Sequence, residues 1–147
     1  MRSGFSVPLA MACLLLTAAL GLALRPLTPI DETRYLAVAW EMYQSGNWLV
    51  PTKNFAVYSD KPPMLFWLVN LVWLVTGVSE FAARMVGPVL GCVALWLTSV
   101  LGRRLWPDMR GIGGDAALAL AGLVVFALSS SLTMFDVPLT VCVLLGL

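Results

Sequence analysis

The sequence predicts an all-α, polytopic membrane protein. Hydrophobic residues make up 60% of its 147 positions and charged residues only 12%, against about 45–50% and about 25% in an ordinary soluble domain. The mean hydropathy is +0.89, and the hydrophobic residues fall into long uncharged runs separated by short charged segments. This pattern excludes a disordered chain and an ordinary cytosolic enzyme. The net charge of +1 indicates no nucleic-acid partner.

The first uncharged run covers residues 7–24 and lies between Arg2 and Arg25. As a helix it measures about 27 Å, enough to cross a hydrocarbon core of about 30 Å. A cleaved signal peptide is the alternative, because residues 21–23 are small or apolar enough for a cleavage point. The run is longer than the apolar stretch of about 7–15 residues usual in signal peptides, so we interpret it as an uncleaved anchor.

Residues 85–101 and 116–128 form two further predicted spans. The Gly-rich segment between them, residues 102–115, carries three arginines, which is typical of a cytoplasmic loop. A fourth apolar run, 137–147, is too short to cross before the sequence stops. We therefore expect the chain to be the N-terminal part of a longer polytopic protein.

Residues 26–84 form a charged segment between the first two spans. Arg2 and the arginine-rich loop both belong inside, so an even number of crossings lies between them. The apolar run 64–78 is short and carries two tryptophans, which favours an interfacial helix over a span. A second short helix is expected at 31–45. Segment 26–84 then lies outside the membrane as one external loop, and residues 129–138 emerge on the same side.

Polar side chains gather on this predicted external face. Asp31, Arg34 and Tyr35 are spaced by three and four residues, which places them on one side of a helix. Arginine and lysine can hold a phosphate, and a carboxylate can take a proton from an attacking hydroxyl. The combination fits displacement of a lipid-linked phosphate. The residues concerned are Asp31, Arg34, Tyr35, Tyr58, Asp60, Lys61 and Asp136.

Four of these residues, and also Glu41, have an ordinary structural explanation. Asp31 and Asp136 suit helix N-caps. Arg34 and Glu41 fit the solvated face of a helix, and Lys61 fits an interfacial anchor whose ammonium reaches water. No single residue is therefore specific for function.

Five ordered motifs are more specific together than any one of them alone. They are DETRY at 31–35, SGNWLVP at 45–51, YSDKPP at 58–63, EFAAR at 80–84 and GRRL at 102–105. In this order they resemble the N-terminal region of bacterial polyprenyl-phosphate-sugar glycosyltransferases of the GT-C group. That group includes lipid A aminoarabinose transferase, the closer match, and the protein O-mannosyltransferases. The resemblance covers essentially the whole chain.

The resemblance implies inverting transfer of a sugar from a polyprenyl-phosphate donor to a lipid A-like lipid or a protein. It implies a multi-pass protein of the bacterial inner membrane whose active site faces the periplasm. It requires no nucleotide or redox cofactor, and it leaves a divalent metal ion open, with Asp60 as the candidate ligand where the family commonly has Glu. The implied catalytic residues are Asp31 and Asp136. The implied substrate-binding residues are Glu32, Arg34, Tyr35, Tyr58 and Lys61.

The alternative function is that of a non-catalytic membrane fragment or a scaffold that only binds polyprenyl phosphate. The chain by itself is not expected to turn over, because the family has several more transmembrane helices. Transport fits less well, since the charges cluster at one face and none lies in the middle of a span, as an ion path requires.

Overall fold

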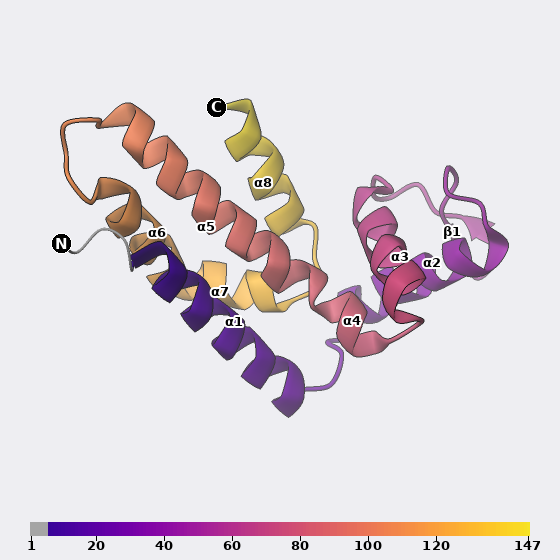
Figure 1. The fold of residues 1–147 in the computed structure, drawn as a ribbon. Helices are drawn as coiled ribbons and strands as arrows, with labels where there is room; N and C mark the ends of the chain where they lie inside the picture. The colour runs from indigo at the N-terminus through magenta and orange to yellow at the C-terminus, as the bar shows by residue number, and fades with distance from the viewer. Residues whose placement is uncertain (1–5) are drawn as a thin grey trace.

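The computed structural model describes residues 6–147, in which helices and one short β-hairpin are joined by turns and loops (Figure 1). This confirms the predicted all-α membrane class. In chain order the elements are α1 (Ser6–Leu24), α2 (Asp31–Ser45), β1 (Thr52–Lys53), β2 (Ala56–Val57), α3 (Met64–Thr76), α4 (Glu80–Arg84), α5 (Val86–Leu105), α6 (Ile112–Gly122), α7 (Val124–Ser131) and α8 (Asp136–Gly146).

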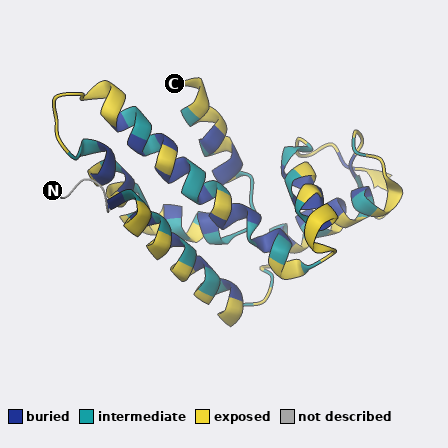
Figure 2. Cartoon of the chain, in the orientation of Figure 1, coloured by how far each residue is buried: buried dark blue, intermediate teal, exposed yellow. Residues whose placement is uncertain are grey.

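Helix α5 is the centre of a bundle formed with α1, α6, α7 and α8. Leu14, Leu95, Ala117 and Val141 lie in its core. Helix α1 buries only one stripe, at a spacing of four residues, and its remaining leucines face outward (Figure 2). A helix that is apolar on every side but packed on one is stable only if hydrocarbon covers the rest. The outer surface of the bundle is therefore suited to lipid.

Within residues 6–147, two helical segments are by themselves long and apolar enough to cross a membrane. They are Ser6–Leu24 and the continuous stretch Glu80–Leu105, which joins α4 to α5. Both contain predicted spans, so these two predictions hold at the level of helix length and composition. Helix α5 continues beyond the expected end at residue 101 and includes Arg103 and Arg104 in its last turn, where cations favour the negative end of the helix dipole.

The third predicted span, 116–128, is not one straight helix. Helix α6 ends at Gly122, α7 begins at Val124, and their axes differ by 71°. Gly122 is a weak helix former, and Leu123 beside it has an extended backbone with ψ of 115°. A glycine at the break is a common cause of such a bend. The bent pair of α6 and α7 contains the predicted residues 116–128, and the crossing of a membrane by this pair stays a prediction.

Helices α2 and α3 and the hairpin between them form a lobe, residues 31–76, at the end of the bundle where α1 ends and α5 begins (Figure 1). Val38, Met42, Phe66 and Trp73 fill its core. The predicted helix 31–45 is confirmed, and Gly46 ends it with φ of 68°, a left-handed conformation that glycine adopts without steric cost.

Glu41 organises the hairpin of this lobe. Its carboxylate accepts hydrogen bonds from the Thr52 hydroxyl at 2.8 Å and from the backbone N–H groups of Asn54 at 2.5 Å and Phe55 at 3.2 Å. Burial by itself raises the pKa of Glu41, but these hydrogen bonds outweigh it and the pKa is lowered. Asn54 and Phe55 both have positive φ, which asparagine tolerates and phenylalanine does not favour, so Glu41 holds a turn that is unfavourable at Phe55. Its role is structural and not only that of a solvated helix face.

Gly87 marks a close backbone approach that provides a stability test. A Cβ atom on Gly87 would lie 2.8 Å from the carbonyl oxygens of Ser130 and Leu132. We expect Gly87→Ala to lower the free energy of unfolding by about 1–3 kcal/mol, because backbone must move to admit the methyl group. Thermal unfolding in detergent measures this loss. Gly21→Ala is the matched control, since nothing lies within 4 Å of its Cβ position; equal losses in both variants would contradict the close approach.

Candidate functional site

The first turns of α2 bring together three of the predicted site residues. Arg34 donates a hydrogen bond to Asp31 in an ion pair, and its guanidinium carbon lies 5.6 Å from the ring centroid of buried Tyr35. The hydrogen bond with Asp31 raises the pKa of Arg34. The N-cap of α2 is Ile30, without a side-chain cap. The N-cap explanation of Asp31 is therefore wrong: Asp31 is the first helical residue, where its charge favours the helix dipole.

Arg34 and Tyr58 each bury a donor that has no partner. The Nε atom of Arg34 and the hydroxyl of Tyr58 are both shielded from solvent and make no hydrogen bond within the described residues. Burial raises the pKa of Tyr58, although the nearby positive charge of Arg34 partly opposes this, so the hydroxyl keeps its proton at neutral pH. An unsatisfied buried donor is costly. An anion with several acceptor oxygens is a partner chemically suited to such donors.

Lys61 adds a second cation to this region. Its Nζ atom lies 5.8 Å from the ring centroid of Phe135, in cation–π contact. Phe135 also packs edge-on against Tyr35 at 5.2 Å and Phe66 at 5.6 Å between ring centroids. Because Phe135 directly precedes Asp136, the structure confirms that Lys61 and Asp136 lie at the same end of the bundle.

The two predicted catalytic carboxylates do not touch. Asp136 is exposed at the first position of α8, and among the described residues no hydrogen bond or ion pair joins it to Asp31. The N-cap of α8 is Phe135, without a side-chain cap, so the N-cap explanation of Asp136 was also wrong. The ring contact between Tyr35 and Phe135 connects the helix that carries Asp31 to the residue that precedes Asp136.

Asp60 is exposed and close enough to Tyr58 for its charge to act on the phenol. Within residues 6–147, no three side chains of the His, Cys, Asp and Glu types gather as metal ligands. Asp60 as a ligand of a divalent metal therefore stays a prediction.

Glu32 faces the interior instead of the region of Arg34 and Tyr58. It is completely buried and accepts hydrogen bonds from Arg25 at 2.5 Å and from the backbone N–H groups of Thr28 at 2.9 Å and Thr133 at 2.8 Å. Burial by itself raises the pKa of Glu32, but these donors outweigh it and lower the pKa from 4.5 to about 2. The carboxylate is therefore charged and fully occupied by the chain itself.

Sequence reasoning missed two residues that shape this region. Phe135 is the aromatic bridge between α2, α3 and Lys61, and nothing in its spacing distinguishes it from other apolar residues near a span. Arg25 was interpreted only as the end of the first span, yet it pairs with Glu32. An arginine followed within ten residues by a glutamate at a helix start was the available signal, and it is a weak one.

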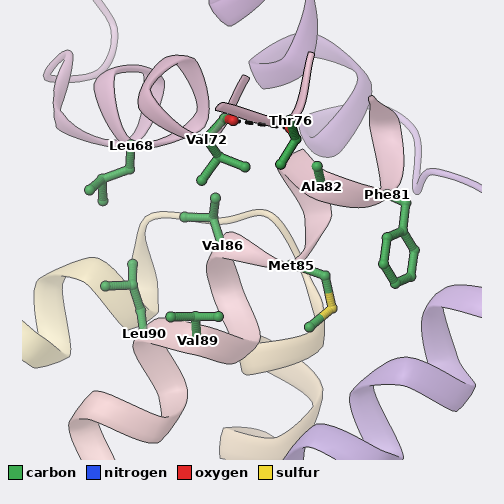
Figure 3. Close-up of a pocket in the computed structure, with 9 residues that line it drawn as sticks. All are labelled: Leu68, Val72, Thr76, Phe81, Ala82, Met85, Val86, Val89 and Leu90. Atoms are coloured by element: carbon green, nitrogen blue, oxygen red, sulfur yellow. Dashed lines mark hydrogen bonds between the residues drawn. The ribbon is translucent and has the colours of Figure 1, made fainter. Parts of the chain in front are cut away.

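An apolar groove of about 410 Å³ lies between α3 and the start of α5. Figure 3 shows Leu68 and Val72 of α3 on one side of it and Val86, Val89 and Leu90 of α5 on the other. Apart from Thr76 its lining has no polar side chain, and the Thr76 hydroxyl is hydrogen-bonded to the Val72 carbonyl. The groove is therefore chemically suited to a hydrocarbon chain and not to a sugar.

Comparison with known proteins assigns the family. Residues 60–147 match the family described as dolichyl-phosphate-mannose-protein mannosyltransferase. The chain belongs to this family of GT-C glycosyltransferases. The predicted resemblance is thereby confirmed. No solved structure matches the chain.

Curated relatives of this mannosyltransferase-family chain include two Pseudomonas enzymes named undecaprenyl phosphate-alpha-4-amino-4-deoxy-L-arabinose arabinosyl transferase. The one from Pseudomonas savastanoi pv. phaseolicola is 33% identical over 77% of this chain and 21% of the relative. The one from Pseudomonas fluorescens is 35% identical over 64% and 17%. An uncharacterized protein of Aquifex aeolicus is 42% identical over 41% and 14%. The chain thus spans about one fifth of the length of the first two.

The lowered pKa of Glu32 predicts an acid-sensitive fold. Because the pKa is 4.5 when unfolded and about 2 when folded, the carboxylate stabilises the fold fully above about pH 4.5. This contribution, up to about 3 kcal/mol, is lost as the pH falls from 4.5 towards 2. Chemical denaturation across this window measures it. In Glu32→Gln this component should be missing, so parallel pH profiles for wild type and variant would contradict the assignment.

Proposed function

We propose that this chain supplies the donor-phosphate site and the acceptor-activating carboxylate of a membrane glycosyltransferase. The donor is a polyprenyl-phosphate sugar, the acceptor is a hydroxyl of a lipid A-like lipid or of a protein, and the site faces the periplasm of the bacterial inner membrane. The observation that carries the proposal is the pair of buried, unpartnered donors on Arg34 and Tyr58, with the Lys61 cation at the neighbouring Phe135 ring.

The phosphate of the donor takes the place of the missing acceptor. Arg34 offers a planar fork and Lys61 a point charge, which are the two usual cationic partners of phosphate. Tyr58 keeps its proton and donates a third hydrogen bond. The same groups stabilise the negative charge that develops on the phosphate as its bond to the sugar breaks. They therefore act in the transition state as well as in binding.

Phosphate binding also frees the base. In the unliganded chain, Asp31 is occupied by Arg34. A phosphate that engages Arg34 competes for the same guanidinium and leaves the Asp31 carboxylate able to take the proton of the acceptor hydroxyl. The acceptor oxygen then bonds to the anomeric carbon, the bond from that carbon to the phosphate oxygen breaks with its electrons, and the configuration inverts. Asp136 is proposed as a second acid that orients the acceptor.

The names of the relatives support a polyprenyl-phosphate sugar as the donor. The two Pseudomonas relatives are named for transfer from an undecaprenyl phosphate-linked sugar, which is a polyprenyl-phosphate donor. The apolar groove between α3 and α5 offers a surface for the prenyl chain. We also propose that Asp60 binds a divalent metal ion. Sugar transfer measured with and without a chelator of divalent metals tests this.

Asp31→Asn tests the catalytic base. In the full-length protein we expect sugar transfer to fall by about 10²–10⁴-fold, because the amide cannot accept the acceptor proton, while membrane insertion is unchanged. Transfer of labelled sugar from a polyprenyl-phosphate donor in membranes measures this. Asp115→Asn, which changes the acid in the first turn of α6, is the matched control and keeps wild-type transfer. Near-normal transfer by Asp31→Asn would refute the role given to this carboxylate.

Tyr58→Phe tests the phosphate site. Loss of one hydrogen bond to an anion is expected to weaken binding of polyprenyl phosphate by about tenfold or more. Equilibrium binding of polyprenyl phosphate to the purified full-length protein measures it. Tyr43→Phe removes the hydroxyl of a tyrosine in α2 that packs on Trp73 and is expected to bind as wild type. Equal affinities for wild type and Tyr58→Phe would exclude the phenol from the site.

A further inference from the structure

Glu32 and Arg25 tie together segments that are far apart in the sequence. The Arg25 guanidinium donates to Glu32 and, at 2.6 Å, to the carbonyl oxygen of Ser131. Glu32 in turn accepts the N–H of Thr133 at 2.8 Å. The backbone carbonyl of Arg25 accepts a hydrogen bond from Arg84 at 3.2 Å. The side-chain and backbone contacts of Arg25 and Glu32 thus join the end of α1, the start of α2, the end of α4 and the segment from Ser131 to Thr133.

The loop between α7 and α8, residues 132–135, is held from two sides. On one side Gly87 of α5 brings its backbone so close that a Cβ would meet the carbonyls of Ser130 and Leu132 at 2.8 Å. On the other side Glu32 binds the N–H of Thr133, which is almost fully buried. These contacts are to backbone groups, so they restrict where the chain runs and not only where a side chain points.

The held loop delivers two groups to the candidate site. Phe135 at its end packs against Tyr35 and forms the ring over which the Lys61 ammonium lies. Asp136 follows directly and begins α8. Asp31, by contrast, sits on α2 and needs no loop to place it. The position of Phe135 and Asp136 relative to α2 therefore depends on the contacts of Glu32 and Arg25.

We propose that the Glu32–Arg25 ion pair is a positioning element. It holds the α7–α8 loop in a fixed position against the phosphate-binding face of α2, and thereby also fixes the positions of Phe135 and Asp136. This differs from the predicted role of Glu32 in binding substrate, because every oxygen contact of Glu32 goes to the chain itself. The catalytic consequence rests on the proposed function, whereas the registration of the loop does not.

The test compares two Glu→Gln changes in the full-length protein. Glu32→Gln removes the charge that holds the loop. Glu80→Gln is the matched control, because Glu80 pairs with Arg84 at 3.1 Å and is 54% exposed on its side chain. Spin labels at Ala37→Cys on α2 and Leu139→Cys on α8, both exposed, report the distance between these helices after the native cysteines are replaced by serine. Sugar transfer per folded molecule gives kcat and the KM for the lipid donor.

We expect Glu32→Gln to broaden the distance distribution and to lower kcat by about 10- to 100-fold, with the donor KM nearly unchanged, and Glu80→Gln to alter neither. Wild-type distances and kcat in Glu32→Gln would overturn the proposal. A raised KM at unchanged kcat would overturn it in favour of direct substrate binding. If the role of Glu32 were purely structural, Glu32→Gln would reduce only the amount of folded protein. The distance between the spin labels and the kcat per folded molecule would then be as in wild type, and this result would also overturn the proposal.

Arg25→Lys carries the test if Glu32→Gln does not accumulate. Lysine keeps the positive charge beside Glu32 but cannot reach Glu32 and the Ser131 carbonyl with one planar group. A smaller shift in the same direction supports the proposal, and wild-type distances with wild-type kcat contradict it. If wild-type protein transfers no sugar at all, the proposed function fails, and the distance measurement alone still decides whether the ion pair registers the loop.

Discussion

A carboxylate removed from water needs hydrogen-bond donors for both oxygens, and this requirement shapes the junction between the bundle and the lobe. Glu32 is fully buried and meets the requirement with one guanidinium and two backbone N–H groups. Such a charge is strongly unfavourable once a partner is removed. The segments that supply the donors, at Arg25, Thr28 and Thr133, must therefore stay together whenever the protein is folded.

The outer surface of the bundle and part of the exposed face of α2 differ in polarity. Exposed leucines and valines lie on the outer faces of α1, α7 and α8, where only hydrocarbon is a favourable neighbour. The exposed positions of α2 include Thr33, Ala37 and Gln44, which tolerate water. The charged residues of the candidate site lie where these two surfaces meet. A lipid-linked phosphate has the same division into an apolar tail and a charged head, which is why this junction suits it.

Local sequence predicted much of the helical structure. The run from Asp31 to Ser45 is confirmed as α2, because its periodicity and the glycine that follows are both local signals. The side-by-side placement of Asp31, Arg34 and Tyr35 follows from helical spacing in the same way. The bend within the third predicted span was not foreseen, because the preference of Gly122 and Leu123 for a break is small beside the hydrophobicity of the run. The N-cap assignments failed because a cap depends on the φ and ψ angles of one residue, Ile30 or Phe135, and composition carries little information about those angles.

The sequence by itself determined the membrane class, the helical segments, the family resemblance and the residue types able to hold a phosphate, because each of these follows from composition, periodicity or motifs that are contiguous in the chain. Only the tertiary structure decided that Glu32 faces inward, that Phe135 joins Lys61 to Tyr35, and that the Nε atom of Arg34 and the hydroxyl of Tyr58 are left unpaired. These facts depend on contacts such as that between Glu32 and Thr133, which are about a hundred residues apart. The energy of such contacts comes from the removal of water at a junction that exists only after the segments have packed.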